Sequence, residues 1–200
     1  MNIEEMIRAV QKELGVSVDG RAGPGTWSAI CNRIVPAGEG QPPAATEIVD
    51  SRSEGNIATL LPEVQPYARA LVHKASAAGI TIKVINGTRT YEEQDALYAQ
   101  GRTKPGPVVT HAKAGESNHN FGLAFDVGVF EGSAYLAESP AYKAVGALGV
   151  ELGLTWGGNW QTLTDQPHFE LRPGWARDLT EKQMLAGLRE RKAAGESLLA

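Results

Sequence analysis

The sequence predicts an α+β fold in which a small antiparallel sheet is flanked by helices, together with a small all-α module at the N-terminus. Three short apolar runs show strand-like alternation, at residues 80–86, 124–130 and 168–171. Helical patterns lie around these runs without a strict strand–helix–strand rhythm. This mixture favours the α+β class.

The composition is that of an ordinary globular protein. Of 200 residues, 42% are hydrophobic and 21% are charged, which suffices for one domain and a small module. A net charge of −4 argues against a general nucleic-acid binder, because phosphate binding needs basic residues in excess. The single cysteine, Cys31, excludes an internal disulfide and lies in an apolar pattern typical of a core residue.

Neither a signal peptide nor a membrane span is expected. Residues 1–5 lack a basic start and a continuous apolar segment. No stretch approaches the roughly 20 apolar residues that cross a bilayer. We therefore expect synthesis in the cytoplasm, without membrane insertion.

Residues 1–35 are predicted to form the helical module. Asn2 and Glu5 have the spacing of a capping box, and Gly15 is a plausible helix end. Between them, apolar residues recur at helical spacing: Ile3, Met6, Ile7, Val10 and Leu14. A second helix is expected to open at residues 23–26. Proline and glycine dominate residues 36–46, which we interpret as a linker.

Residues 47–200 are predicted to form the main domain. Its helices are expected at residues 61–79, 90–100, 139–152 and 180–194. Two of them begin with capping-box patterns, Thr90 with Glu93 and Thr180 with Gln183. Residues 101–115 are expected to form a loop, and residues 156–160 a tight turn.

Alternation in the strands predicts a polar cleft. If Asp126 faces the cleft, its neighbours on that face are Ala124 and Gly128, whose small size would leave room for an ion and substrate. The core side of the same strand carries Phe125, Val127 and Val129. His168 on the next strand would face the cleft while Phe169 and Leu171 face the core. Gly122 would let the backbone turn so that His119 and Asp126 converge.

The residue types at this cleft suit zinc. His119, Asp126 and His168 would supply two imidazoles and one carboxylate for a single ion, leaving a fourth position open as catalytic zinc sites do. A base is needed to move the proton of an attacking water molecule. Asp165 lies three residues before His168, so it could stand beside the metal without being a ligand.

Three sets of motifs along residues 50–175 resemble one known family. The first is Gly87-Thr88-Arg89-Thr90-x-x-Glu93-Gln94-x-x-Leu97-Tyr98-x-x-Gly101-Arg102. The second is Ser117-x-His119-x-x-Gly122-x-Ala124-x-Asp126. The third is Trp156-Gly157-Gly158-x-Trp160 with Asp165-x-Pro167-His168-Phe169. They resemble the VanY-like superfamily of zinc peptidases, which groups D-alanyl-D-alanine carboxypeptidases with L-alanyl-D-glutamate endopeptidases.

The resemblance implies a role for each site residue. His119, Asp126 and His168 would bind zinc, and Asp165 would be the general base. Arg89 would bind the substrate and help to polarise the scissile carbonyl. Ser117 would line the substrate cleft.

The N-terminal module resembles a second family, the peptidoglycan-binding-domain repeat of cell-wall hydrolases, although it is one helix shorter. The matching residues are Val10-Gln11, Leu14-Gly15-Val16, Asp19-Gly20, Gly23-Pro24, Thr26-Trp27 and Ala29-Ile30. A helical hairpin packed on the main domain is the other interpretation.

These resemblances favour a monomeric zinc endopeptidase that acts on bacterial peptidoglycan. Asp rather than Glu as the base resembles the L-alanyl-D-glutamate branch, which is common among phage endolysins released by holins. The alternatives are a D-alanyl-D-alanine carboxypeptidase, a host remodelling enzyme, and a non-catalytic wall-binding or phage structural protein.

Other polar residues have less certain interpretations. Glu170 could support His168 or be a surface charge. His73 and His111 are expected not to be ligands, and Trp156 and Trp160 are expected to pack rather than frame the cleft. The charged residues of the last helix are expected to form a solvated face: Glu181, Lys182, Arg189, Glu190, Arg191 and Lys192.

Overall fold

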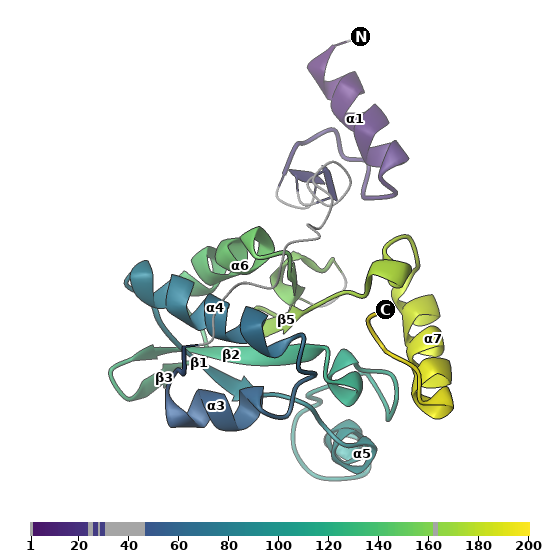
Figure 1. The fold of residues 1–200 in the computed structure, drawn as a ribbon. Helices are drawn as coiled ribbons and strands as arrows, with labels where there is room; N and C mark the ends of the chain where they lie inside the picture. The colour runs from purple at the N-terminus through teal and green to yellow at the C-terminus, as the bar shows by residue number, and fades with distance from the viewer. Residues whose placement is uncertain (1, 24–25, 28, 31–46, 162–163) are drawn as a thin grey trace.

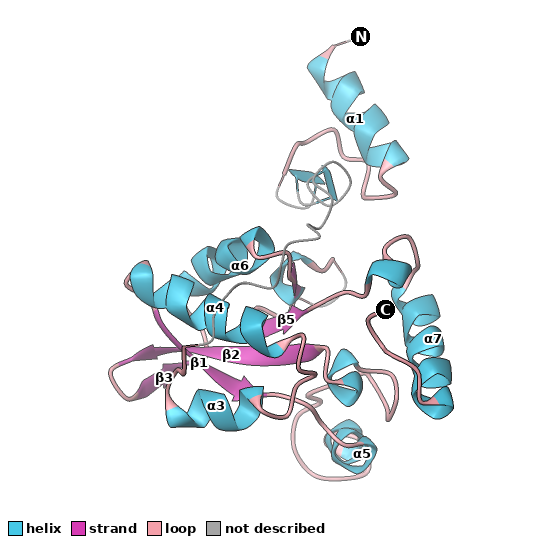
Figure 2. Cartoon of the chain, in the orientation of Figure 1, coloured by secondary structure: helices cyan, strands magenta, loops and turns pink. Residues whose placement is uncertain are grey.

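The computed structural model describes residues 2–23, 26–27, 29–30, 47–161 and 164–200. Its centre is an antiparallel sheet with helices around it (Figures 1 and 2), which confirms the predicted α+β class. The strands are β1 (Thr81–Asn86), β2 (Ala124–Glu131), β3 (Ala134–Leu136), β4 (Thr155–Trp156) and β5 (His168–Glu170). Their order is β1-β2-β5-β4, and β3 pairs with the far end of β2.

The helices of the main domain cover this sheet and its ends. They are α3 (Ser51–Ile57), α4 (Gln65–Ala77), α5 (Tyr91–Ala99), α6 (Ala141–Glu151) and α7 (Glu181–Ala194). Both predicted capping boxes form, at Thr90 for α5 and at Thr180 for α7. Short 3-10 turns add η1 (Asn118–Phe121), η2 (Gly157–Asn159) and η3 (Gly174–Ala176).

Buried apolar side chains of the sheet and of α3, α4, α6 and α7 form one core cluster. Phe125, Val127 and Phe169 are fully buried, and Val129 nearly so, as the alternation predicted. The rings of Phe125 and Phe169 stack with their centroids 5.9 Å apart, joining β2 to β5. This packing fixes the register in which the two strands meet.

Three local predictions differ from the structure. Helix α4 begins at Gln65 rather than near residue 61, because Pro66 is tolerated only in a helix's first turn. Helix α3 was not predicted, since its mostly polar sequence lacks an apolar period. It is held instead by two tertiary hydrogen bonds: Oγ of Ser53 accepts from the backbone nitrogen of Val84, and Nδ2 of Asn56 donates to the carbonyl oxygen of Val84.

Gly128 also differs from the expectation. A Cβ atom there would lie 2.8 Å from the Tyr135 ring and 3.0 Å from that of Phe130. The space beside Gly128 is therefore filled by aromatic rings, and the prediction that it leaves room for an ion and substrate is wrong. Strand β3, which carries Tyr135, was too short to be predicted.

In the N-terminal part, helix α1 (Ile3–Glu13) has the predicted capping box between Asn2 and Glu5. Gln11 is buried, and its amide nitrogen donates to Asp19 and Thr26. Cys31 and the predicted linker lie outside the described residues, so the domain boundaries stay a prediction. Among the described residues, no helix combines the length and the apolar composition that a bilayer-spanning segment needs.

Candidate metal centre

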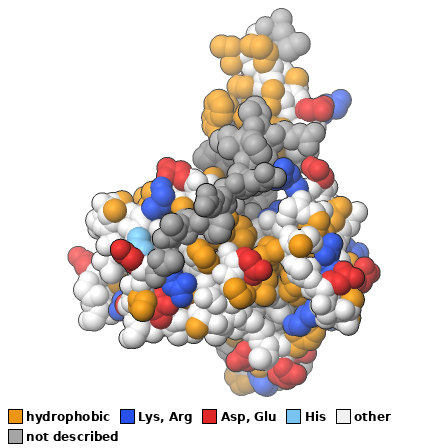
Figure 3. Space-filling view, in the orientation of Figure 1, with side chains coloured by type: hydrophobic (Ala, Val, Ile, Leu, Met, Phe, Trp, Pro, Cys, Tyr) orange, Lys and Arg blue, Asp and Glu red, His pale blue; other side chains and the backbone are white. Residues whose placement is uncertain are grey.

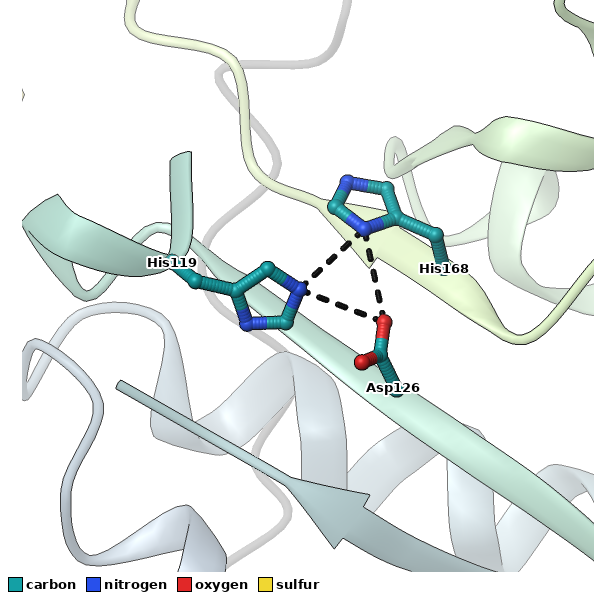
Figure 4. A group of neighbouring side chains, drawn as sticks. All are labelled: His119, Asp126 and His168. Atoms are coloured by element: carbon teal, nitrogen blue, oxygen red, sulfur yellow. Dashed lines mark hydrogen bonds and ion pairs between the residues drawn. The ribbon is translucent and has the colours of Figure 1, made fainter. Parts of the chain in front are cut away.

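Two histidines and an aspartate meet where β2 and β5 pair. Asp126 and His168 are direct partners across the two strands, and His119 reaches them from η1 (Figure 4). All three side chains are buried, and one ligand atom from each lies within 4.8 Å of the others. Among the described residues, no other group of three such side chains is so close.

Gly122 closes the turn that brings His119 to Asp126. It adopts a left-handed backbone with φ of +70°, directly after η1. A Cβ atom there would lie 3.0 Å from the backbone nitrogen of Leu61. The predicted need for glycine at this turn is confirmed.

The hydrogen bonds of the two imidazoles indicate which nitrogen faces the centre. Nδ1 of His119 lies 2.8 Å from the carbonyl oxygen of Gly87, so this nitrogen carries the proton and Nε2 faces inward. Nε2 of His168 lies 3.1 Å from Oε2 of Glu170, so Nδ1 faces inward. Such outer partners orient metal-binding histidines in proteins.

The carboxylate of Asp126 is divided between two tasks. Oδ2 accepts hydrogen bonds from Asn86 Nδ2 and Arg89 Nη2, each at 3.0 Å. Oδ1 is buried without a hydrogen bond, 3.2 Å from Nε2 of His119 and 3.4 Å from Nδ1 of His168. Three acceptor atoms thus converge, and this arrangement fits a cation between them.

The electrostatics of the centre also favour positive charge. Burial disfavours ionised Asp126, yet the two imidazoles hold its pKa well below the usual range. Burial likewise opposes a charged His168, but the nearby carboxylates of Asp126 and Glu170 raise its pKa to about 10. Carboxylates that stabilise an imidazolium so strongly would also stabilise a metal dication at the same place.

Glu170 supports His168 and is not a surface charge. Its side chain is buried, and Oε2 accepts a 2.6 Å hydrogen bond from Nδ2 of Asn118 as well as the contact with His168. This settles the two interpretations left open by the sequence. The role of Asn118 was missed, because only the fold brings it to Glu170.

Asp165 lies between η2 and β5. Its backbone nitrogen donates to Gly157, and its carbonyl oxygen accepts from the backbone nitrogen of His168. Burial, and next the charge of Asp126, raise the pKa of the Asp165 carboxyl. A carboxylate with a raised pKa is a stronger base than an ordinary one, as proton transfer requires.

Arg89 is joined directly to the cluster. Besides its bond to Asp126, its Nη1 donates to Oε1 of the buried Gln94 at 3.1 Å. Gln94 and Asn86 are therefore further residues of the site that sequence reasoning missed. Asn86 ends β1 opposite Asp126, a juxtaposition that depends on strand register. Ser117 precedes η1 and is half-buried, and its side chain does not cap that turn.

The other two histidines and the two tryptophans of the third motif differ in their distance from the cluster. His73 contacts the backbone oxygen of Glu47, and His111 lies beside Arg102, so the structure does not bring either into the cluster. Trp156 is buried and donates to the backbone of Gln166, as a packing residue does. Trp160, in contrast, lies against the site, with its ring centroid 4.8 Å from that of His168.

The chain is similar in sequence to known proteins. A family model described as D-alanyl-D-alanine carboxypeptidase matches residues 110–171. The peptidoglycan L-alanyl-D-glutamate endopeptidase CwlK of Bacillus subtilis (strain 168) is 38% identical over 124 residues, which is 57% of this chain and 74% of CwlK.

Two solved structures are also similar. The L-Ala D-Glu endopeptidase ChiX of Serratia marcescens has a TM-score of 0.45 and 22% identity, covering 64% of this chain and 92% of ChiX. The second structure is a mutant of the D,D-pentapeptidase VanY from a VanB-type resistance cassette, in complex with Zn(II). It has a TM-score of 0.44 and 16% identity, and the match covers 70% of this chain and 81% of VanY. On the sequence match to CwlK, the chain belongs to the family of zinc-dependent peptidases that comprises D-alanyl-D-alanine carboxypeptidases and L-alanyl-D-glutamate endopeptidases and hydrolyses peptidoglycan stem peptides.

Proposed function

We propose that this peptidase hydrolyses the L-alanyl-D-glutamate bond of peptidoglycan stem peptides. The observation that carries the proposal is the 38% identity to CwlK, a peptidoglycan L-alanyl-D-glutamate endopeptidase. The carboxylate three residues before His168 belongs to Asp165 rather than to a glutamate. This form of the motif resembles the L-alanyl-D-glutamate endopeptidase branch of the family.

In this proposal His119, Asp126 and His168 bind one zinc ion through Nε2, Oδ1 and Nδ1. The convergence of these three acceptor atoms supports the assignment. Zinc supplies Lewis acidity toward water and toward the scissile carbonyl. Glu170, Gly87 and the donors on Asp126 Oδ2 keep the three side chains oriented.

Asp165 is assigned the proton transfers. Its carboxylate accepts a proton from the attacking water and returns it to the amine nitrogen of D-glutamate as the C–N bond breaks. Burial favours its uncharged form, so the carboxylate accepts a proton more readily than an exposed aspartate does.

Arg89 and Ser117 are assigned to the substrate. Two N–H groups of Arg89 contact Asp126 and Gln94, and the others are the donors we assign to the developing oxyanion. Ser117, at the start of the segment that carries His119, is assigned to the cleft wall.

The second candidate is D-alanyl-D-alanine carboxypeptidase activity, which is the description of the family model over residues 110–171. Mass spectrometry of digested stem peptides separates the two activities. Our proposal expects a product that begins with D-glutamate, whereas free D-alanine as the sole product would replace it with the second candidate. The His168→Ala variant is expected to release neither.

We further propose that the N-terminal module binds the cell wall. Its exposed apolar side chains include Ile3, Met6 and Val10 of α1, and Trp27 is 56% exposed. Figure 3 shows hydrophobic side chains on the surface of the α1 region. In the inactive His168→Ala background, Trp27→Ala should reduce co-sedimentation with purified peptidoglycan severalfold, whereas Glu13→Gln in the same module should not. Equal sedimentation of both would contradict wall binding by this surface.

The biological role we propose is that of a phage endolysin. A wall-binding motif joined to a stem-peptide hydrolase supports it. When the chain is expressed in a susceptible bacterium, lysis should require co-expression of a holin, and the His168→Ala variant should not lyse. Normal growth with both proteins present would favour a remodelling enzyme of the host instead.

A further inference from the structure

The C-terminal helix α7 is joined to the metal centre by a chain of hydrogen bonds. Oε1 of Glu181, the first residue of α7, lies 2.8 Å from Nδ2 of Asn118. The same nitrogen lies 2.6 Å from Oε2 of Glu170, which is 3.1 Å from Nε2 of His168. Helix α7 thus reaches an inward-facing imidazole through two side chains, although it lies outside the segment that the family model matches.

The side chain of Asn118 takes part in this series of hydrogen bonds through its amide nitrogen alone. It is 5% exposed, and its Oδ1 is buried without a hydrogen bond, an arrangement that costs of order 1–3 kcal/mol. The two carboxylates would repel each other, and the shared N–H₂ group lies between them. Arg172 Nη1, 3.2 Å from Oε2 of Glu181, balances part of their charge. Both donor hydrogens of Asn118 are therefore committed to carboxylates.

The same helix also binds the segment that carries His119. Arg189 donates to the carbonyl oxygen of Gly115 at 2.8 Å, and Lys192 donates to that of Asn120 at 3.0 Å. With Glu181, these residues lie on one face of α7, since positions eight and eleven residues apart return to the same side of a helix. Glu181, Arg189 and Lys192 are exposed, as the predicted solvated face requires, but each also makes a hydrogen bond that the sequence did not indicate.

We propose that Asn118 and Glu181 are positioning residues of the zinc centre. Glu181 holds Asn118, Asn118 holds Glu170, and Glu170 keeps Nδ1 of His168 directed at the metal. Helix α7 is thereby a part of the metal site. This inference rests on the proposed ligand set.

The test is the zinc dissociation constant, measured by competition with a chelator. Asn118→Ala should weaken zinc binding about tenfold and Glu181→Ala about threefold, at and below the lower end of the range for outer partners of metal ligands. Glu181→Gln keeps an acceptor for Asn118 and should retain most of the affinity. The matched control is Glu190→Ala on the exposed side of the same helix, which should bind zinc as the native chain does.

Two further measurements separate positioning from simple stabilisation. With zinc removed by chelator, Glu181→Ala and Glu190→Ala should unfold at the same temperature. In the zinc-loaded protein, ¹⁵N NMR of the histidine rings should show a single His168 tautomer in the native chain and line broadening or a second form in Asn118→Ala. Glu181→Ala decides the matter if Asn118→Ala does not fold.

Native dissociation constants for both Asn118→Ala and Glu181→Ala would overturn this inference. The same holds if Glu181→Ala weakens zinc binding only as much as Glu190→Ala does. If His168→Ala itself bound zinc with native affinity, the proposed ligand set would be wrong instead. Loss of binding in His168→Ala alone would leave that set intact.

Discussion

At the scale of single residues, the two oxygens of the Asp126 carboxylate, a proposed zinc ligand, have different surroundings. Oδ2 is occupied by Asn86 and Arg89, while Oδ1 is left without a donor. A carboxylate fixed in this way offers one oxygen, which matches the single carboxylate oxygen needed in a tetrahedral zinc site. Asn86 ends β1 and Arg89 lies three residues beyond it, so the end of this strand orients the proposed ligand on the neighbouring strand β2.

The first prediction concerns Asn86. In Asn86→Ala, Oδ2 of Asp126 keeps only the bond from Arg89, and the carboxylate can rotate. Zinc affinity should fall by roughly tenfold in a chelator competition assay. The control is the unfolding temperature of the variant measured with chelator present. A lower unfolding temperature without any loss of zinc affinity would contradict the role of Asn86 in orienting Asp126.

The second prediction concerns Asp165. Asp165→Asn removes the proposed proton acceptor but no proposed ligand, so the chain should still bind about one zinc ion. Its rate of stem-peptide hydrolysis should fall by roughly 10²–10⁴-fold, the usual contribution of a general base. Loss of zinc together with activity would make Asp165 a metal ligand, and unchanged activity would exclude it as the base.

At the scale of elements, α6 owes its position to two glycines. A Cβ atom on Gly149 would lie 2.4 Å from the Phe169 ring, and one on Gly146 would lie 2.4 Å from the Trp156 ring. Phe169 and Trp156 flank the metal-site residues of β5 and the turn after β4. The close approach of α6 therefore packs the back of the strand that carries His168.

The third prediction tests this packing. Gly149→Ala should lower the free energy of unfolding by about 1–3 kcal/mol, because the added methyl group displaces Phe169. Gly55→Ala on α3 is the matched control, since nothing lies within 4 Å of its added Cβ atom. That variant should be as stable as the native chain or up to about 1 kcal/mol more stable. Equal effects in urea unfolding would contradict the packing argument.

The fourth prediction concerns the ion pair that joins α3 to α4. Arg69 donates two hydrogen bonds to Oε2 of Glu54 and one to Oε1, at 2.8–3.2 Å, and chiefly for this reason the pKa of Glu54 is lowered. A group whose pKa is lower in the folded state than in the unfolded state stabilises the fold at pH values above its unfolded-state pKa. This contribution is lost as pH falls through the folded-state pKa.

Glu54→Gln should therefore lower the free energy of unfolding by about 1 kcal/mol near pH 7. The difference from the native chain should be complete above the unfolded-state pKa, about 4.3 for a glutamate, and should shrink as pH falls through the lowered folded-state pKa of Glu54. The measurement is urea unfolding across this pH range. A difference that grew in acid would contradict the sign of the argument.

At the scale of the whole molecule, the proposed zinc ligands join parts of the chain that are far apart in sequence. His119 and His168 are 49 residues apart, and their inward nitrogens lie within 3.3 Å. Ligand binding to the folded state alone stabilises that state by mass action. The metal is thus expected to contribute to global stability as well as to catalysis.

The fifth prediction follows from this linkage. Free zinc at 100 times its dissociation constant should raise the free energy of unfolding by about 2.7 kcal/mol relative to chelator-treated protein. The His168→Ala variant should show little of this increment. A zinc-dependent increment that persisted in the variant would indicate binding elsewhere.

Local features of the fold could be predicted from the sequence alone. Capping boxes at Asn2, Thr90 and Thr180 depend on residues three positions apart, and all three form. Alternation identified the apolar core faces of β2 and β5, although the opposite faces of these strands are buried as well. The proposed ligand types and the turn at Gly122 were also readable, because the motif that carries them is short.

The parts that could not be predicted depend on contacts across long sequence separations. Asn118 and Glu181 are 63 residues apart, and Asn86 and Asp126 are 40 apart. Tertiary structure alone decided that Glu170 is buried beside His168, that aromatic rings fill the space at Gly128, and that charged residues of α7 bind the segment that carries His119. Strand register and helix packing set these contacts, whereas propensity and periodicity report only on neighbours along the chain.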